Sequence, residues 1–371
     1  MPTGPSKKAA ASPAWMRLAL VVFSMLVALG LIEGAVRIRQ WSKYGRPAGA
    51  AFEAATDPAS GLRIPKPNFD TGKIKIDSRG FRSPELEVPK PPGRIRLAFV
   101  GASTTFCAEV SSNEATWPQL VRNDLAAHYP DLAFDFVNGG VPGYSVESMR
   151  KNLEFRIAPV APDVIVYYEA SNDLSKDTRA LAKRTGLYDG TPEDPSPVAK
   201  VSVAWYLVEK NLLVRERQRL AHTAPRLVYN ADSLAQGFEV RLRDLLAEAR
   251  TIAPVCAAAT FSHKVRRDQS PDVQLLNCSS SLYYTPYMSV KGLLDGWDAY
   301  NRAIRKAARE AGVILVDGED SIPADDAHFA DSVHFLDPGA RSMADRVTAG
   351  LVASREFEQL IESRRRVLAG K

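Results

Sequence analysis

Short hydrophobic runs alternate with longer amphipathic stretches along most of the chain after residue 93. Short apolar runs bounded by Pro, Gly or polar residues are typical of buried strands, and apolar positions at helical spacing are typical of helices. Strands are predicted at 95–100, 133–137, 164–168, 254–261 and 313–316. Helices are predicted at about 116–128, 146–157, 232–252, 292–311 and 338–361. This alternation predicts an α/β fold, a three-layer α/β/α sandwich around a five-stranded parallel sheet.

Two regions interrupt the alternation. Residues 40–92 are rich in Pro and Gly, and within them 73–77 alternates like an edge strand before a turn at 78–82. Residues 177–229 are polar and contain several prolines. An interruption of this length in a compact domain is usually a lid, a binding loop or a disordered segment. The predicted organisation is a disordered tail at 1–13, a membrane anchor at 14–37, a connector at 38–93, and a domain at 94–361 with an insertion at 177–229.

The anchor is predicted from an apolar stretch near the amino end. It extends from Trp15 to Val36, and residues 18–32 carry no charge. With its flanks, this stretch is long enough to span a bilayer as one transmembrane helix. A cleaved signal peptide is the rival interpretation, and a buried core helix is a third. No clean small-x-small cleavage motif follows, which favours an uncleaved anchor.

Charge does not settle the orientation of this stretch. It is preceded by Lys7, Lys8 and Arg17 and followed by Arg37, Arg39, Lys43 and Arg46. That distribution leans against export of the following domain, although long domains can cross a membrane regardless of flanking charge.

The 371-residue chain has a net charge of +5, much of it at the two ends. No aromatic-basic interleaving or zinc-finger spacing indicates nucleic-acid binding.

The three cysteines are too few for a disulfide framework. Cys256 and Cys278 could pair, and buried free thiols are an equally consistent interpretation.

Candidate chemistry begins where the first predicted strand ends, at residues 101–105. Gly101 and Ala102 are small enough for a sharp turn, which would present Ser103 at the carboxyl edge of the sheet. Ligands bind at that edge in open α/β folds. The alternative interpretation is a Ser/Thr turn followed by a helix cap.

A nucleophilic serine needs a base and a site for the developing oxyanion. The candidate bases are His128, His222, His263, His328 and His334. The first two are expected on the surface, and the third follows a strand and could reach the sheet edge without a local partner.

Each of the last two histidines follows an aspartate by three residues. Asp325 precedes His328, and Asp331 precedes His334. The second pair stands directly before the last helix, at a strand-to-helix junction on the same edge as Ser103. The alternative is a metal site built from Asp325, Asp326, His328, Asp331 and His334.

Polar stretches also follow the second and third predicted strands. Residues 138–145 contain three glycines, and residues 169–173 contain Asn172. A glycine lets a backbone N–H approach a ligand closely, and an asparagine amide donates hydrogen bonds without carrying charge. Each stretch alone is typical of a turn or cap. Together with Ser103 and an Asp-x-x-His pair, they place polar groups at four carboxyl edges and indicate a catalytic site.

These motifs, in this order, resemble the SGNH/GDSL hydrolase superfamily over about residues 94–355. Residues 101–105 resemble its nucleophile block, and residues 138–145 resemble its second block. Residues 170–173 resemble the Gly-x-Asn-Asp block, and residues 331–334 resemble the final block. The resemblance implies the catalytic residues Ser103, His334 and Asp331 and an oxyanion hole formed by Ser103, Gly143 and Asn172.

Two departures from the family pattern remove no catalytic side chain. The nucleophile block lacks the Gly-Asp-Ser core, and Ala170 replaces the glycine of the third block. Residues 77–82 of the connector are similar to bacterial membrane-anchored members of the superfamily.

The resemblance implies an SGNH-type, flavodoxin-like fold and a serine esterase of carboxylic esters. It implies no metal or organic cofactor, and an acyl-ester small molecule or glycan as substrate. An O-acyltransferase acting on cell-surface polysaccharide with the same residues, and a non-catalytic membrane-tethered binding module, are the alternatives. The expected location is the cytoplasmic membrane, with a single span and the catalytic domain on the periplasmic or extracytoplasmic side.

Overall fold

The computed structural model describes residues 13–44, 53–188, 195–220 and 226–370. The chain divides into two compact units. The first comprises Met1–Gly49 and Asp194–Lys210, and the second comprises Ala50–Glu193 and Asn211–Lys371. The predicted disordered tail, apart from residue 13, and His222 lie outside the described residues.

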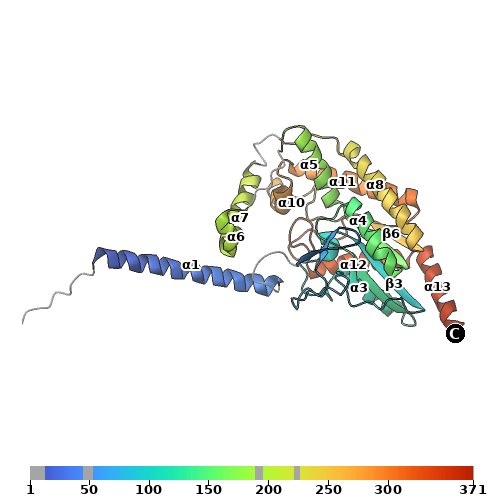
Figure 1. The fold of residues 1–371 in the computed structure, drawn as a ribbon. Helices are drawn as coiled ribbons and strands as arrows, with labels where there is room; N and C mark the ends of the chain where they lie inside the picture. Colours follow the sequence, from blue (N-terminus) through green and yellow to red (C-terminus); the bar gives the residue numbers. More distant parts are fainter. Residues whose placement is uncertain (1–12, 45–52, 189–194, 221–225, 371) are drawn as a thin grey trace, which may run out of the picture. The chain divides into compact units, whose positions relative to one another are not determined.

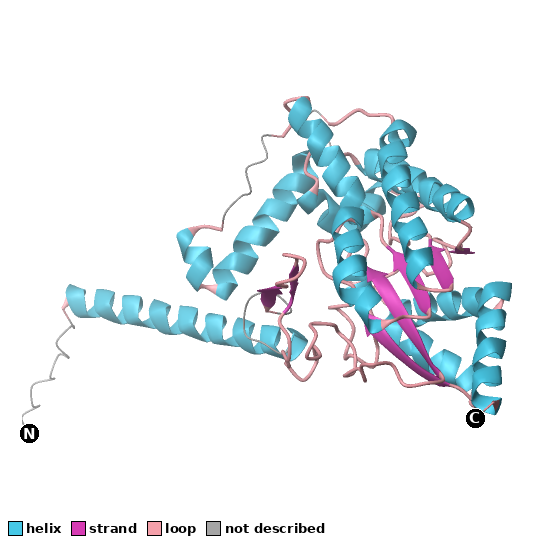
Figure 2. Ribbon diagram, turned by 45° about the vertical axis from the view of Figure 1, so that its right-hand side comes forward, coloured by secondary structure: helices cyan, strands magenta, loops and turns pink. Residues whose placement is uncertain are grey.

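The second unit is built on a five-stranded parallel sheet (Figure 2). Its strands are β3 (Arg94–Gly101), β4 (Ala133–Asn138), β5 (Val164–Tyr168), β6 (Val255–Ala259) and β7 (Ile314–Val316). They are hydrogen-bonded in the order β4-β3-β5-β6-β7, and every neighbouring pair is parallel. This is the strand order of flavodoxin-like sheets. The predicted fold class and the five predicted strands are confirmed.

Helices cover both faces of this sheet, with α4, α8 and α11 on one face and α3 and α12 on the other (Figure 1). The longer helices are α3 (Trp117–His128), α8 (Ala231–Ile252), α11 (Val290–Ala311), α12 (Asp337–Val352) and α13 (Arg355–Ala369). The shorter ones are α4 (Val146–Asn152), η1 (Leu153–Ile157), η2 (Ala158–Val160), α9 (Pro271–Asn277) and α10 (Ser279–Tyr284).

The helix predicted at 338–361 is in fact two helices. The Oγ of Ser354 accepts a hydrogen bond from the backbone N–H of Phe357 at 3.3 Å, so Ser354 caps the start of α13. Leu351 and Phe357 are both fully buried. The apolar pattern therefore continues through the break, which is why the sequence resembles one helix.

The region at 177–229, predicted as a polar interruption, is largely helical where the structure describes it. Helix α5 (Ser171–Arg184) includes its first residues, and α6 (Pro197–Val201) and α7 (Val203–Leu220) follow. Pro197 lies in the first turn of α6, where proline fits because its missing N–H has no intrahelical partner. The expectation of an irregular loop from the polar, proline-containing composition was therefore wrong for the described part of this region.

The part of the connector from Ala50 onward belongs to the second unit. The predicted strand at 73–77 is wrong, because Lys75 makes only an isolated bridge with Asp70. The connector instead contains an antiparallel pair, β1 (Ala54–Thr56) and β2 (Arg63–Pro65). The predicted turn at 78–82 is present, and Gly80 has the left-handed φ of +81° that favours glycine.

Arg82 joins this connector to the short helix α2 (Ser103–Phe106), which follows β3. Its side chain is buried, and its guanidinium donates hydrogen bonds to the carbonyl oxygens of Phe106, at 2.9 Å, and Cys107. Its Nε donates to Asn113 at 2.9 Å. The carbonyl groups at the end of α2 therefore receive their hydrogen bonds from the connector.

The first unit contains the apolar helix α1 (Ala14–Tyr44). Residues 14–42 of this helix are long and apolar enough to cross a membrane, a property that both an anchor and a signal sequence have. Glu33 accepts hydrogen bonds from the Ser202 hydroxyl at 2.8 Å and from the backbone N–H groups of Val203 and Ala204 at 2.9 and 3.0 Å. Glu33 thus caps the start of α7.

Cys107, Cys256 and Cys278 are all buried free thiols. Cys256 and Cys278 are therefore not paired in this structure.

We predict that Arg82→Met lowers the free energy of unfolding by about 2–4 kcal/mol, because two carbonyl groups of the α2 region lose a charged donor. Urea denaturation of the full-length protein in detergent measures this change. Arg79→Met is the matched control, because Arg79 lies in the same turn and is exposed. A loss of stability of the same size in the control would contradict the role given to Arg82.

Candidate active site

The turn that carries Ser103 depends on two glycines. Gly101 comes just before it in the chain, and Gly140, from the segment after β4, packs against it. A Cβ atom on Gly101 would lie 2.1 Å from the Thr105 hydroxyl oxygen and 2.6 Å from the Tyr168 carbonyl oxygen. A Cβ atom on Gly140 would lie 2.6 Å from the Phe106 backbone nitrogen. These contacts are far closer than real side chains allow, so the backbone segments at the ends of β3, β4 and β5 approach one another only because these residues are glycines.

Asn138 fixes the same turn by hydrogen bonds. Its side-chain amide donates to the Thr105 carbonyl oxygen at 2.8 Å, and its side-chain oxygen accepts from the Gly140 N–H at 3.0 Å. On the neighbouring residue, the Thr104 carbonyl oxygen accepts from the indole N–H of Trp117 at 3.0 Å. The first turn of α2 is therefore held by both β4 and α3, and Ser103 is its first residue.

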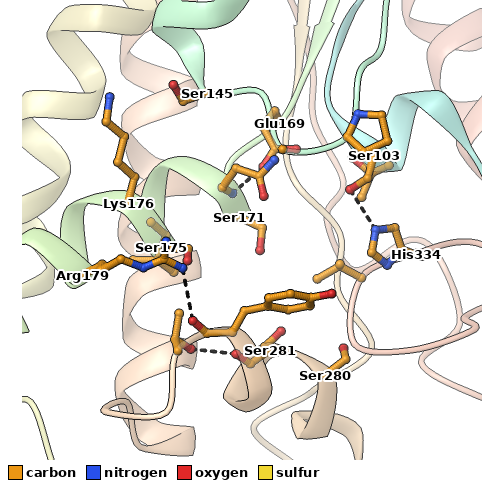
Figure 3. A pocket seen from close by; sticks show the side chains of 18 of the residues that line it. Ser103, Ser145, Glu169, Ser171, Ser175, Lys176, Arg179, Ser280, Ser281 and His334 are labelled. Atoms are coloured by element: carbon orange, nitrogen blue, oxygen red, sulfur yellow. Dashed lines mark hydrogen bonds between the residues drawn. The ribbon is translucent and has the colours of Figure 1, made fainter. Parts of the chain in front are cut away.

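Ser103, His334 and Asp331 form one chain of hydrogen bonds, and Figure 3 shows its link between Ser103 and His334. The Nε2 atom of His334 lies 2.8 Å from the Ser103 Oγ, and its Nδ1 atom lies 2.8 Å from the Asp331 Oδ2. The other carboxylate oxygen of Asp331 accepts from the backbone N–H groups of Val333 and His334 at 2.9 and 3.0 Å. With the Nδ1–H donated to Asp331, Nε2 faces the Ser103 hydroxyl as a hydrogen-bond acceptor.

Gly143 and Asn172 line the same cavity as these three residues. Gly143 has a φ of +88°, in the left-handed region that favours glycine. The Asn172 amide donates one hydrogen bond to the Tyr144 carbonyl oxygen at 3.0 Å, which leaves its second N–H for a ligand. Ala170, at the start of α5, has a φ of −155°, so the alanine found there is unstrained. The five predicted site residues are thus brought together.

The charges around His334 favour its protonated form. Burial alone would lower the pKa of His334, but the nearby carboxylates of Glu109 and Asp331 outweigh burial and raise it to about 10. Burial would likewise raise the pKa of Asp331, but the charge and hydrogen bonds of His334 and the two backbone donors lower it to about 2. Asp331 is therefore ionised at neutral pH and able to stabilise an imidazolium.

Two further carboxyl groups line the cavity and were not predicted as site residues. Glu169 is 1 % exposed, and burial raises its pKa to about 8 although it accepts a hydrogen bond from the Asn172 N–H at 2.6 Å. Glu109 has one buried carboxylate oxygen without a hydrogen-bond partner among the described residues. Glu169 stands within the predicted polar stretch at the end of β5, so its position was a usable signal. Glu109 follows α2 in a segment for which the sequence predicts neither a regular element nor a motif.

Arg63 is a third unpredicted residue, and it comes from the connector. Its guanidinium donates to the Pro142 carbonyl oxygen at 2.7 Å, and its own carbonyl oxygen accepts from the Tyr144 hydroxyl at 2.8 Å. Strand β2 is thus fastened to both sides of Gly143. No sequence pattern predicts this contact, because the two segments are distant along the chain.

The other described histidines lie outside the cavity. His263, which was expected to be able to reach the sheet edge, is buried and stacked on Trp297 with ring centroids 4.3 Å apart. His328 pairs with Asp325 at 2.7 Å but does not line the cavity, and His128 is exposed at the end of α3. Within the described ranges, no group of three or more His, Cys, Asp or Glu side chains is placed to hold a metal ion.

The cavity has a volume of about 920 Å³. Such a volume is typical of sites that enclose a whole small-molecule ligand. It is far more space than an acetyl group occupies.

Comparisons with known proteins bear on this site. The model of the GDSL-like lipase/acylhydrolase family matches residues 99–341. No curated protein matches the chain. Among solved structures, the acetylxylan esterase Axe2 of Geobacillus stearothermophilus is 16% identical with a TM-score of 0.42, and the match covers 71% of this chain and 95% of that one. LAE5, an alpha/beta hydrolase from the metagenome of Lake Arreo, is 14% identical with a TM-score of 0.42, over 69% and 94% of the two chains.

The family match begins within the last residues of β3, contains the turn that carries Ser103, and extends past His334 into α12. It covers more than half of the chain, and it contains the whole parallel sheet apart from the first residues of β3. The chain therefore belongs to the GDSL-like lipase/acylhydrolase family and is a hydrolase that acts on ester bonds.

Proposed function

We propose that this chain cleaves carboxylic esters, from acetyl to larger acyl groups, with Ser103 as nucleophile, His334 as base and Asp331 as the acid that orients the base. The observation that carries the proposal is the unbroken line of contacts from Asp331 through His334 to Ser103, with both links at 2.8 Å. This is the geometry of a serine nucleophile activated by an adjacent, oriented base.

The reaction has two balanced steps. In the first, the Ser103 oxygen bonds to the ester carbonyl carbon while His334 takes the serine proton and then delivers it to the leaving alcohol. This step breaks the bond between acyl carbon and alcohol oxygen and leaves an acyl group on Ser103. In the second, His334 takes a proton from water, the water oxygen bonds to the acyl carbon, and the proton returns to Ser103 as the free acid leaves.

The oxyanion of each tetrahedral intermediate needs hydrogen-bond donors near Ser103. We assign this role to the backbone N–H groups of Ser103 and Gly143 and to the free amide N–H of Asn172. Ser103 is the first residue of α2, so its N–H has no intrahelical acceptor. Removing one such donor costs about 10²–10³ in turnover in known serine hydrolases.

The second step can also deliver the acyl group to a sugar hydroxyl instead of water. The same residues would then serve an O-acyltransferase acting on cell-surface polysaccharide. The two activities differ only in the acceptor, so a comparison of water with a glycan acceptor separates them.

We further propose that α1 is retained and holds the catalytic domain on the outer side of the cytoplasmic membrane. The contacts of Glu33 with Ser202, Val203 and Ala204 support retention, because cleavage of α1 as a signal would leave the backbone N–H groups of Val203 and Ala204 without this acceptor. The outward orientation depends on the resemblance of the connector to anchored bacterial proteins and not on the flanking charges.

The function is tested by the hydrolysis of a panel of acyl esters with the full-length protein in detergent. We expect Ser103→Ala and His334→Ala to reduce turnover by about 10³-fold or more, because members of such a unit act together. His328→Ala is the matched control, since His328 also pairs with an aspartate three residues earlier, and it should stay within about twofold of the wild type.

Two measurements complete this test. A fluorophosphonate probe should label Ser103 and no other serine. A deacetylated glycan offered beside water should gain no acyl groups if the chain is a hydrolase. Labelling elsewhere with Ser103 untouched, or a larger loss in His328→Ala than in His334→Ala, would refute the assignment.

The pH dependence of kcat/KM should report the charges around His334. A base works only when it is unprotonated, so kcat/KM should rise with pH along an acid limb whose midpoint lies above the usual histidine pKa. Because the Glu109 carboxylate stabilises the imidazolium, Glu109→Gln should move that midpoint to lower pH. Glu114→Gln is the control, since Glu114 is exposed and does not line the cavity. A midpoint in Glu109→Gln that is unchanged or higher would contradict this electrostatic role.

Reporter fusions after Lys371 test the orientation. We expect an alkaline phosphatase fusion to be active and a green fluorescent protein fusion to be dark, because the carboxyl end would lie outside the cytoplasm. A bright fluorescent fusion with silent phosphatase would place the active site inside the cell. Amino-terminal sequencing of the membrane fraction tests retention separately, because a start near residue 30–40 would show cleavage.

A further inference from the structure

A row of basic side chains lines the cavity along α5. Lys176, Arg179 and Lys183 are spaced three and four residues apart, so they lie on one face of the helix, and all three line the cavity. Arg184 is adjacent in the sequence but is not part of the lining. Figure 3 shows Lys176 and Arg179 on the side of the cavity across from Ser103 and His334.

Two of these cations remain available to a ligand. Lys176 forms an ion pair with Glu147. Arg179 donates a long hydrogen bond, 3.4 Å, to the carbonyl oxygen of Tyr284 and also hydrogen-bonds the Tyr287 side chain, and no carboxylate of the described chain pairs with Arg179 or Lys183. Both side chains are exposed. An anion bound by them would therefore not have to displace a carboxylate of the described chain.

The acidic groups of the lining gather at the opposite end. Asp331 and Glu109 act on His334, and burial raises the pKa of Glu169 so that this carboxyl group is largely neutral at pH 7. This end also carries the positive charges of Arg63 and of protonated His334, so its carboxylates are partly offset. The α5 end carries cations without carboxylate partners among the described residues, and it therefore attracts the negative charge of a substrate more strongly and orients the substrate with that charge on α5.

The space between the two ends suits a polyhydroxylated molecule. The hydroxyl-bearing lining residues include Ser145, Ser171, Ser175, Ser280, Ser281 and Thr285. Tyr284 also lines the cavity, with 60% of its surface exposed. An exposed aromatic ring gives an apolar surface for the C–H face of a sugar ring, and hydroxyl groups donate to and accept from sugar hydroxyls.

We propose that the substrate is an acyl ester of an anionic carbohydrate, such as an esterified uronic-acid glycan, and that Arg179 and Lys183 bind its negative charge. The inference rests on the proposed function for the ester cleavage. It adds to that function the chemical class of the substrate and the residues that select it.

The test compares two acetylated oligosaccharides of equal length and acetyl content, one made of uronic acids and one of neutral xylose. The full-length protein should have the higher kcat/KM on the uronic-acid ester, and this preference should weaken as salt is added. The double variant Arg179→Gln/Lys183→Gln should lose about tenfold in kcat/KM on the uronic-acid ester and less than about twofold on the neutral one. Arg184→Gln is the matched control and should change neither.

A binding measurement keeps this inference separate from the ester chemistry. Calorimetry with Ser103→Ala should show binding of the uronic-acid oligosaccharide, and the two α5 substitutions added to that variant should weaken it by a similar factor. Binding without hydrolysis by the wild type would refute the proposed function and leave the anion site standing. Equal activity on both esters, equal losses on both in the double variant, or a preference for phosphatidylglycerol vesicles over the uronic-acid ester would overturn the anion site.

Discussion

The close approach of three backbone segments around α2 is the constraint on which the candidate site depends. The register of the sheet places Gly101 beside Tyr168 on β5 and Phe99 beside Asn138 on β4. Ser103 therefore leaves the sheet between the two strands whose ends carry Gly143 and Asn172. A side chain on Gly101 or Gly140 would push these segments apart, and the proposed nucleophile and the proposed oxyanion donors would separate together. The glycines set the distances on which every later chemical step relies.

The electrostatics of the site follow from the same crowding. Three carboxyl groups lie near His334, and like charges in a small volume cannot all be ionised without cost. The three carboxyl groups lie in different environments, which favour different protonation states. Asp331 receives two backbone donors and stays ionised, Glu169 is buried and largely holds its proton at neutral pH, and Glu109 lines the cavity with one buried oxygen that has no hydrogen-bond partner among the described residues. The charge next to the base is consequently adjustable at Glu109 without disturbing the hydrogen bonds of Asp331.

The sequence predicted the parallel sheet and the five proposed site residues, because both depend on short segments with their own signals at the ends of strands. It could not predict Arg63, whose place in the site results from packing between distant segments. The sequence also predicted a single helix where the structure has α12 and α13, because apolar residues continue at helical spacing across Ser354. The two departures from the family motifs are explained by burial, because Ala102 and Ala170 are fully enclosed and need no hydrogen-bond partners there.

The two ends of the cavity are subject to different physical demands. The nucleophile end is made of strand ends and tight turns, where glycines and buried donors leave little freedom for substitution. At the other end, α5 buries Leu174, Thr178 and Ala182 on one face, and its exposed cations lie on another. Substitutions of Arg179 or Lys183 therefore disturb neither the core nor the helix. The buried face of the helix holds its backbone in place when an exposed side chain is exchanged, so the proposed charge preference of the cavity can change while the proposed ester chemistry stays the same.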